Sequence, residues 1–224
     1  YGVAQTWSLH PIKNVMAWGD GGVVTTHDEG LAQEVRLLRD HGVQDRDEWS
    51  KPVYNSRLDS IHAIVAYHHL SQLDDITRRR REHAALYDRL LAGLPGIHVQ
   101  ARVSEIVHPY HLYIIEADRR DGLLAFLITH GIEAKVHYPK PLHLQPALRG
   151  VAIDGRTFPN AQRQAGRILS LPVHQHLVEG QIRYVADMIA ALRQTHDPDR
   201  PRYRTPGRRG MRALSAGRWL TLSR

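Results

Sequence analysis

The residue with the clearest potential for chemistry is Lys13, which is one of only four lysines beside 26 arginines. An arginine stays protonated in a protein, whereas a lysine amine can lose its proton and form a Schiff base with a carbonyl compound. Lys13 lies in a turn-rich segment, directly before the run Gly19-Asp20-Gly21-Gly22. A single loop lysine is far more often solvated than catalytic, so its type and position make Lys13 a candidate only.

The composition excludes several classes of chemistry. The chain has 224 residues and no cysteine, which removes disulfides, cysteine-ligated zinc, iron–sulfur clusters and thiol catalysis. Hydrophobic residues make up 42%, enough for a packed core. No apolar run approaches the roughly 18 residues of a membrane span, and no signal-peptide pattern begins the chain. We therefore expect a cytoplasmic protein with no membrane contact.

The positive charge is concentrated at the C-terminal end. The net charge is +7, but residues 197–224 hold eight arginines and two aspartates, so residues 1–196 carry only +1. We expect 197–224 to be a basic, disordered tail. A function other than catalysis is also open: the tail could bind a polyanion such as a nucleic acid, with Tyr203 and Trp219 stacking on bases. No recognisable nucleic-acid-binding fold accompanies the tail, so we do not expect a nucleic-acid partner.

The sixteen histidines raise the question of a metal site. His108 and His111 are three residues apart, and His174 and His176 are two apart, but neither pair forms a helical His-Glu arrangement with a third ligand. We expect no metal site.

The elements around Lys13 follow from local patterns. Residues 1–22 predict a loop-rich start and residues 23–26 a short strand. Asp28 predicts the start of a helix to about residue 40, and 43–54 is expected to be irregular. A 3.6-residue period predicts one long helix over about 60–91, with the basic run 78–81 as a solvated face.

The second half of the chain predicts a small α+β unit with a sheet covered by helices. Strands are expected over 97–100, over 110–116 with both faces buried, and over 132–138. Helices are expected over 121–130, beginning at Asp121, over 158–168 and over 179–193, the last with an apolar stripe from Ile182 to Ile189.

The segment around Lys13 resembles the DegT/DnrJ/EryC1/StrS family of pyridoxal-phosphate-dependent sugar aminotransferases. The first similar stretch is Ser-Leu-His-Pro-Ile-Lys-Asn at 8–14, followed by Gly-Asp-Gly-Gly-Val-Val-Thr-Thr at 19–26. Further matches follow in the same order over about residues 4–193: Leu-Leu-Arg-Asp-His-Gly at 37–42, Tyr-Asn-Ser-Arg-Leu-Asp at 54–59, His-Tyr-Pro at 137–139 with Pro-Leu-His-Leu-Gln at 141–145, and Ser-Leu-Pro at 170–172.

The resemblance implies an α/β chain of fold type I, the PLP-transferase fold. Residues 1–77 would be the C-terminal remainder of the large cofactor-binding domain. Residues 78–196 would form a long linking helix and a small α+β C-terminal domain, followed by the tail 197–224. Family members carry the lysine near their middle, so the chain resembles an N-terminally truncated member. Residues 3–7 stand where the family has a strand leading into the lysine loop, and they depart from its sequence.

The resemblance also implies site residues. Lys13 would bind pyridoxal 5'-phosphate covalently and shuttle a proton. Ser8 would donate a hydrogen bond to the cofactor phosphate, and Asn55 would reach the phosphate of the neighbouring subunit. Arg57 is expected to contact substrate or amino donor, and His137 and Tyr138 to line the sugar-nucleotide site, although His137 could equally serve only to cap a strand end.

The implied reaction is transfer of an amino group, with glutamate as the expected donor, to a nucleotide-linked keto sugar. A lysine at position 13 favours amino transfer, because some relatives that dehydrate the sugar carry histidine there. The partner would be a second copy, in a homodimer with shared active sites, or an upstream partner chain. The family's missing portion supplies the acidic residue at the pyridine nitrogen, so a catalytically inactive fragment or pseudoenzyme is the alternative.

Overall fold

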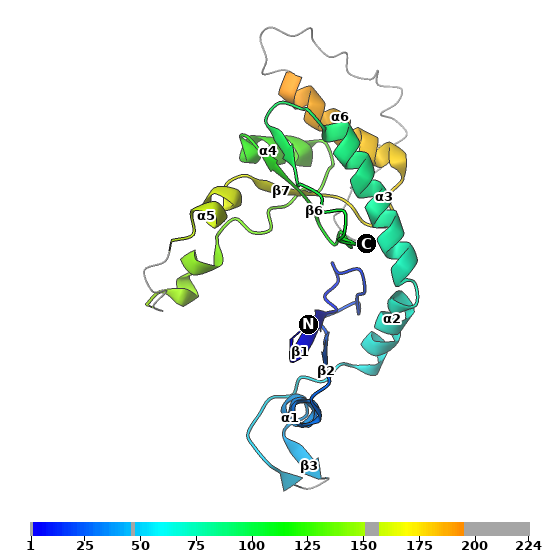
Figure 1. The fold of residues 1–224 in the computed structure, drawn as a ribbon, viewed down its shortest axis with the longest axis vertical. Coiled ribbons are helices and arrows are strands. Elements are labelled where there is room, and N and C mark those ends of the chain that lie inside the picture. Colours follow the sequence, from blue (N-terminus) through cyan, green and yellow to red (C-terminus); the bar gives the residue numbers. More distant parts are fainter. Residues whose placement is uncertain (1, 46–47, 151–156, 195–224) are drawn as a thin grey trace. The chain divides into compact units, whose positions relative to one another are not determined.

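The structure is a computed structural model that describes residues 2–45, 48–150 and 157–194. The chain divides into two compact units, residues 1–76 and 77–224, which we describe separately (Figure 1). The predicted tail, 197–224, lies outside the described residues.

The first unit begins with an antiparallel ribbon. Strand β1 (Ala4–Ser8) pairs with β2 (Gly22–Thr26), in a register that places Ser8 opposite Gly22. The expected strand at 23–26 is thus confirmed, but the loop predicted over 1–22 is wrong for 4–8. Thr6 and Trp7 favour extended backbone, and the Trp7 indole Nε1 donates to Thr25 Oγ1 across the ribbon at 3.0 Å.

Helix α1 (Glu29–Arg39) confirms the helix predicted after Asp28. The Asp28 carboxylate accepts a hydrogen bond from the backbone N–H of Leu31 at 2.9 Å, which satisfies one of the unpaired donors of the first turn. Gly42, which has a left-handed backbone with φ +70°, follows shortly after the end of the helix. The stretch predicted to be irregular instead contains a short antiparallel pair, β3 (Val43–Asp45) and β4 (Glu48–Trp49).

The long helix predicted over 60–91 is two helices, α2 (Ser60–Leu70) and α3 (Leu73–Leu91). They are separated at Ser71, whose hydroxyl donates to the His68 carbonyl oxygen at 2.8 Å and so offers the backbone an alternative to the helical ladder. The periodic pattern continues across this break because both helices present an apolar face.

The second unit is built on an antiparallel sheet in the order β5-β6-β7. Its strands are β5 (Ile97–Val99), β6 (Tyr113–Ala117) and β7 (Ile168–Leu171), and Tyr113 lies opposite Leu171. The strand predicted over 132–138 is wrong: this segment forms no strand, although Lys135 makes an isolated bridge with Ser170, and the third strand is β7. Strand β6 alternates buried and half-buried residues, so the prediction that both faces are buried is also wrong.

Helices α3, α4 (Arg120–Thr129) and α6 (Glu179–Gln194) pack with this sheet around one core (Figure 1). Helix α4 begins after Arg119, which has left-handed backbone, rather than at Asp121. Short helices η1 (Leu142–Leu144), η2 (Pro146–Leu148) and α5 (Pro159–Ala165) precede β7. The predicted stripe of α6 is confirmed, since its members are all buried: Ile182, Val185, Ala186 and Ile189.

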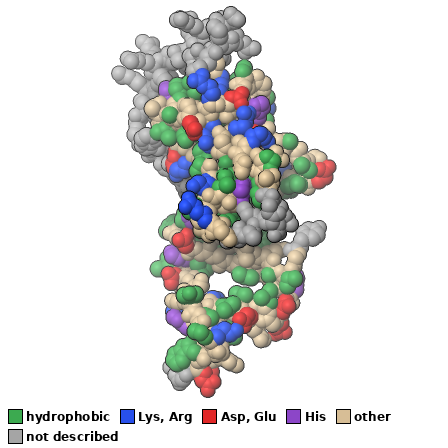
Figure 2. All heavy atoms as spheres, turned by 90° about the vertical axis from the view of Figure 1, so that its left-hand side faces the viewer, with side chains coloured by type: hydrophobic (Ala, Val, Ile, Leu, Met, Phe, Trp, Pro, Cys, Tyr) green, Lys and Arg blue, Asp and Glu red, His purple; other side chains and the backbone are tan. Residues whose placement is uncertain are grey.

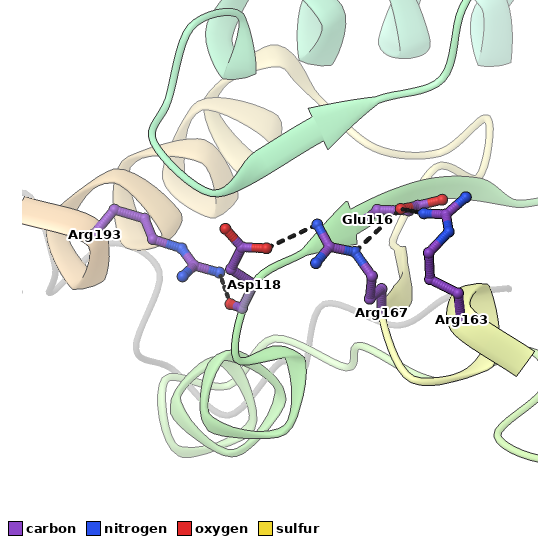
Figure 3. Close-up of polar contacts among 5 residues, drawn as sticks. All are labelled: Glu116, Asp118, Arg163, Arg167 and Arg193. Carbon is purple, nitrogen blue, oxygen red and sulfur yellow. Dashed lines mark hydrogen bonds and ion pairs between the residues drawn. The ribbon is translucent and has the colours of Figure 1, made fainter.

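A network of arginines and carboxylates joins the end of β6 to α5 and α6 (Figure 3). Glu116 Oε2 accepts from Arg163 at 3.0 Å and from Arg167 at 3.2 Å. Arg167 also pairs with the Asp118 carboxylate at 2.7 Å, and Arg193 donates to the Asp118 carbonyl oxygen at 2.6 Å. Arg163 and Arg167 are thus paired with carboxylates within the unit, whereas Arg193 donates to a neutral carbonyl oxygen.

The first unit exposes a large amount of apolar surface. In helix α2 the exposed apolar side chains recur every three residues and include Ile61, which is 71% exposed. The ribbon adds further exposed side chains: Trp7, Val23 and Val24. On the face drawn in Figure 2, basic and acidic side chains both occur among the hydrophobic ones. Among the described residues, no helix combines the length and the hydropathy needed to cross a membrane.

Candidate active site

The loop that carries Lys13 connects the two strands of the ribbon. The N–H of Leu9 donates to the Gly21 carbonyl oxygen at 2.9 Å, and the N–H of Ala17 donates to the Leu9 carbonyl oxygen at 2.9 Å. Within the loop, the N–H of Lys13 donates to the His10 carbonyl oxygen at 2.8 Å. Lys13 is therefore held on a closed, hydrogen-bonded loop, and its side chain is half-buried.

Apolar packing fixes the same loop against helix α2. Leu9 and Ala17 are buried with Ala66 of α2 in a small cluster, which Val15 and Leu58 complete. A Cβ atom at Gly21 would lie 2.8 Å from the Leu58 side chain, so a larger residue there would require Leu58 to shift.

Ser8, at the end of β1, has a hydroxyl whose hydrogen is available. Its Oγ accepts from the N–H of His10 at 3.4 Å. A hydroxyl has one donor and two acceptor positions, and within the part of the chain that the structure describes Ser8 donates to no other group. Such a hydroxyl suits a phosphate oxygen, which only accepts.

Asn55 and Arg57 lie close together at the end of α1. Backbone hydrogen bonds hold their segment there: the Ser56 N–H donates to the Arg39 carbonyl oxygen at 2.8 Å, and Asp40 and Asn55 form an isolated bridge. The Asn55 Oδ1 accepts from the Arg57 N–H at 3.3 Å and from Arg57 Nε at 3.1 Å. Arg57 Nη1 also lies 3.5 Å from the Asp40 carboxylate.

Sequence patterns did not identify Asp40 and His10 as residues that hold the candidate site in place. Asp40 lies in one family signature and Arg57 in another, and only the fold pairs them. His10 accepts from Lys13 through its carbonyl oxygen and from the Ile12 N–H through its ring Nδ1, at 3.3 Å. The His-Pro pair before Lys13 is the signal that could have indicated this turn.

His137 and Tyr138 belong to the second unit. The His137 ring Nδ1 is 2.9 Å from the Ser170 hydroxyl, on β7. The adjacent Tyr138 is 70% exposed and lines a largely apolar cavity of about 520 Å³ together with Lys140, His143 and Phe158. His137 is thus tied to the sheet, while Tyr138 is the member of the pair with a free surface.

The histidines that raised the question of a metal do not form a ligand cluster. In the ranges 2–45, 48–150 and 157–194, no three His, Asp or Glu side chains are grouped to hold an ion. The N–H of His176 donates to the His174 ring Nδ1 at 3.3 Å, and the N–H of Tyr110 donates to His108 Nδ1 at 3.0 Å, so these rings accept from the backbone.

The residues of the first unit fit a phosphate-bearing carbonyl compound. The half-buried Lys13 supplies an amine, and the Ser8 hydroxyl is a donor without an assigned acceptor in the described chain. No described carboxylate forms an ion pair with the Lys13 amine. These groups match the needs of pyridoxal 5'-phosphate: an amine for its carbonyl group and hydrogen-bond donors for its phosphate.

Comparison with known proteins identifies the family of the chain. A model of the DegT/DnrJ/EryC1/StrS aminotransferase family matches residues 1–190. The chain therefore belongs to this family, as the signatures around Lys13 predicted.

The chain is similar to the pleiotropic regulatory protein of Geobacillus stearothermophilus, with 40% identity over 84% of this chain and 51% of the relative. The dTDP-3-amino-3,4,6-trideoxy-alpha-D-glucose transaminase of Streptomyces venezuelae is 38% identical over 82% of this chain and 48% of the relative. The chain spans about half the length of the curated relatives it matches.

Among solved structures, S. venezuelae DesV in complex with a ketimine intermediate matches with a TM-score of 0.81 and 36% identity. This match covers 88% of the present chain and 53% of DesV. An aminotransferase of the same family from Brucella abortus matches with a TM-score of 0.80, 31% identity and coverage of 86% and 52%. The predicted α/β, fold type I architecture is thereby confirmed.

Proposed function

We propose that this chain contributes the lysine-bearing half of a pyridoxal-phosphate-dependent enzyme that transfers an amino group to a nucleotide-linked keto sugar. The observation that carries the proposal is the Lys13 loop, a closed and packed segment that holds a half-buried amine within the family's sequence motif. The names of similar proteins support the substrate class, because several are transaminases of dTDP- or UDP-linked sugars.

Each site residue has a defined role in this proposal. When bound, pyridoxal phosphate supplies an electron sink for the charge that develops at the substrate carbon. The Lys13 amine holds the cofactor before the reaction and moves a proton at the substrate carbon during it. Ser8 donates a hydrogen bond to the phosphate of the cofactor on its own chain, and Asn55 donates one to the phosphate held by the neighbouring subunit. Tyr138, on the rim of its cavity, contacts the sugar nucleotide, and His137 keeps this segment on the sheet.

We further propose that a second polypeptide completes the site. The chain spans about half of its relatives, and the exposed apolar side chains of α2 and of the ribbon are the kind of surface that another chain covers. The second polypeptide would be another copy or a chain that corresponds to the remaining half. Without a second polypeptide, the chain would be a non-catalytic fragment, which is the alternative function. The exposed apolar side chains are compatible with this alternative as well.

The decisive test is covalent capture of the cofactor. The full-length chain is incubated with pyridoxal phosphate, reduced with borohydride and digested, and the modified peptide is located by mass spectrometry. We expect the modification on the peptide that contains Lys13, together with a visible absorption band that disappears in Lys13→Ala.

Two controls sharpen the result. Lys51→Ala removes another lysine of the first unit and should leave the Lys13 modification intact. Modification spread evenly over Lys13, Lys51, Lys135 and Lys140 would show non-specific reaction and would refute the proposal. Capture at Lys13 without amino transfer to any nucleotide-linked keto sugar would favour the non-catalytic alternative.

A further inference from the structure

We infer that Arg57 is a positioning residue, which fixes the side-chain amide of Asn55 so that its NH2 group, and not its oxygen, faces the ligand. This inference rests on the proposed function for the identity of the ligand, the phosphate of pyridoxal phosphate. It differs from the role expected from the sequence, in which Arg57 itself contacts substrate or amino donor.

The orientation of the Asn55 amide follows from the chemistry of its neighbours. Both groups that contact its Oδ1, the Arg57 N–H at 3.3 Å and the Arg57 Nε–H at 3.1 Å, can only donate. An amide flipped by 180° would place its own NH2 group against two donors. The oxygen must therefore face Arg57, and the two N–H bonds of Nδ2 must point elsewhere.

The Nδ2 group is available as a pure donor. Within the part of the chain that the structure describes, Asn55 makes no side-chain hydrogen bond other than those to Arg57, and its side chain is exposed. A phosphate oxygen accepts hydrogen bonds and cannot donate to an amide oxygen. If the Asn55 amide rotated freely, its oxygen would face the phosphate for part of the time. Fixing the amide with its NH2 group toward the ligand therefore favours the binding of an anion.

The Arg57 side chain is in turn held in place by a neighbouring carboxylate. Its Nη1 lies 3.5 Å from the Asp40 carboxylate, at the C-terminal end of α1, while its Nε faces Asn55. Side-chain exposures of 52% for Arg57 and 40% for Asp40 mean that the pair adds little stability, because water and salt screen exposed ion pairs. The contact instead sets direction, since the planar guanidinium group can bond Asp40 and Asn55 at once only in a narrow range of orientations.

A double-mutant cycle on the full-length chain tests the inference. Binding of pyridoxal phosphate and of pyridoxal, which lacks the phosphate, is measured for wild type, Arg57→Lys, Asn55→Ala and the double variant. Arg57→Lys keeps the charge but removes the Nε–H donor. We expect each single variant to weaken pyridoxal phosphate binding by about tenfold and to leave pyridoxal binding unchanged, because a hydrogen bond to a charged group is worth about this much.

The double variant separates positioning from direct contact. If Arg57 acts through Asn55, the double variant binds no more weakly than Asn55→Ala alone. Additive losses would show that Arg57 touches the ligand itself, and unchanged binding in Arg57→Lys would show that it has no role; either result overturns the inference. Arg36→Lys, at an exposed position on α1, is the matched control and should bind as wild type does.

Nuclear magnetic resonance tests the same geometry without the cofactor, and so remains decisive if the chain alone binds none. We expect the Arg57 Nε–H to exchange with water several times more slowly than that of Arg36, and to lose this protection in Asn55→Ala. Equal exchange rates for Arg57 and Arg36 in wild type would overturn the inference. If pyridoxal phosphate does not bind through Lys13 but the Arg57 Nε–H is still protected from exchange, the result counts against the proposed function and leaves the positioning contact established.

Discussion

Arg80 is a buried arginine, whereas arginine side chains are usually exposed to solvent. It belongs to the basic run 78–81, which the sequence predicts to be a solvated helix face, yet it is only 2% exposed, so that prediction is wrong for Arg80. Its guanidinium donates to Gln175 Oε1 at 3.1 Å and to the Tyr110 carbonyl oxygen at 3.0 Å. Within the described ranges it forms no ion pair with a carboxylate, and burial lowers its pKa to about 10. The group is therefore still charged at neutral pH, and in the described chain the oxygen atoms that contact it are neutral.

We expect Arg80→Met to lower the free energy of unfolding by roughly 1–3 kcal/mol, because it leaves buried acceptors at Gln175 and Tyr110 without their donor. Arg80→Lys should also destabilise, since one ammonium cannot reproduce the planar fork. Urea unfolding, followed by circular dichroism, measures both changes.

The neighbouring Arg81 provides the matched control, because it lies in the same run but is exposed. Arg81→Met should change the unfolding free energy by no more than about 0.5 kcal/mol. Equal effects of the two methionine variants would contradict the structural role given to Arg80.

Helix α3 also carries a histidine whose environment should make stability depend on pH. Burial lowers the pKa of His83 from its ordinary value of 6.5, and the nearby Arg80 acts in the same direction. Contacts with the backbone of His174 and Val173, and the charge of Glu82, act in the opposite direction and are weaker than the effect of burial. The folded state therefore holds His83 neutral at a pH where the unfolded chain is already protonated.

The sign of the pH effect follows from proton uptake. Because the unfolded state binds more protons than the folded state near pH 6.5, stability falls as the pH drops below this value. We expect His83→Asn to reduce this loss of stability between pH 7 and pH 5. The transition can be followed by near-ultraviolet dichroism of Tyr87 and Tyr113, which stack with ring centroids 4.9 Å apart in this core.

His98→Asn is the control for this experiment, since His98 is exposed on β5. Its pH profile should match that of wild type. A profile that stays equally steep in His83→Asn would show that other groups cause the acid destabilisation.

At the scale of the whole molecule, the two units differ in how well they cover their apolar residues. The second unit has one large buried apolar cluster around its sheet, whereas α2 in the first unit exposes a row of apolar side chains: Ile61, Ile64, Tyr67 and Leu70. A surface of this kind is typical of an interaction site, and it supports the proposal that a second polypeptide covers α2.

We expect the purified chain to self-associate, and the double substitution Ile61→Glu with Ile64→Glu to shift it toward monomer, since charged side chains resist burial. Light scattering coupled to size-exclusion chromatography measures the masses. Val103→Glu with Ile106→Glu places the same charges on an exposed apolar loop of the second unit and serves as control. A change in mass with the control pair, and none with the α2 pair, would contradict the role assigned to α2.

Local patterns were sufficient for a defined part of this protein. The motif around Lys13 identified the family, the Asp28 cap located the start of α1, and the stripe of α6 identified a buried face. Each of these depends on residues that are neighbours in sequence, so capping geometry and helical periodicity can predict them.

The tertiary structure decided what depends on distant residues. Whether 132–138 or 168–171 forms the third strand depended on which segment pairs with β6, and Arg80 is buried because the segments around residues 110 and 175 close over it. The sequence by itself singled out Lys13 as the candidate reactive group and placed Asn55 in a family signature. Only the fold brought Arg57 and Asp40 together and thereby selected which face of the Asn55 amide is free, because hydrogen-bond direction is a property of positioned atoms and not of residue types.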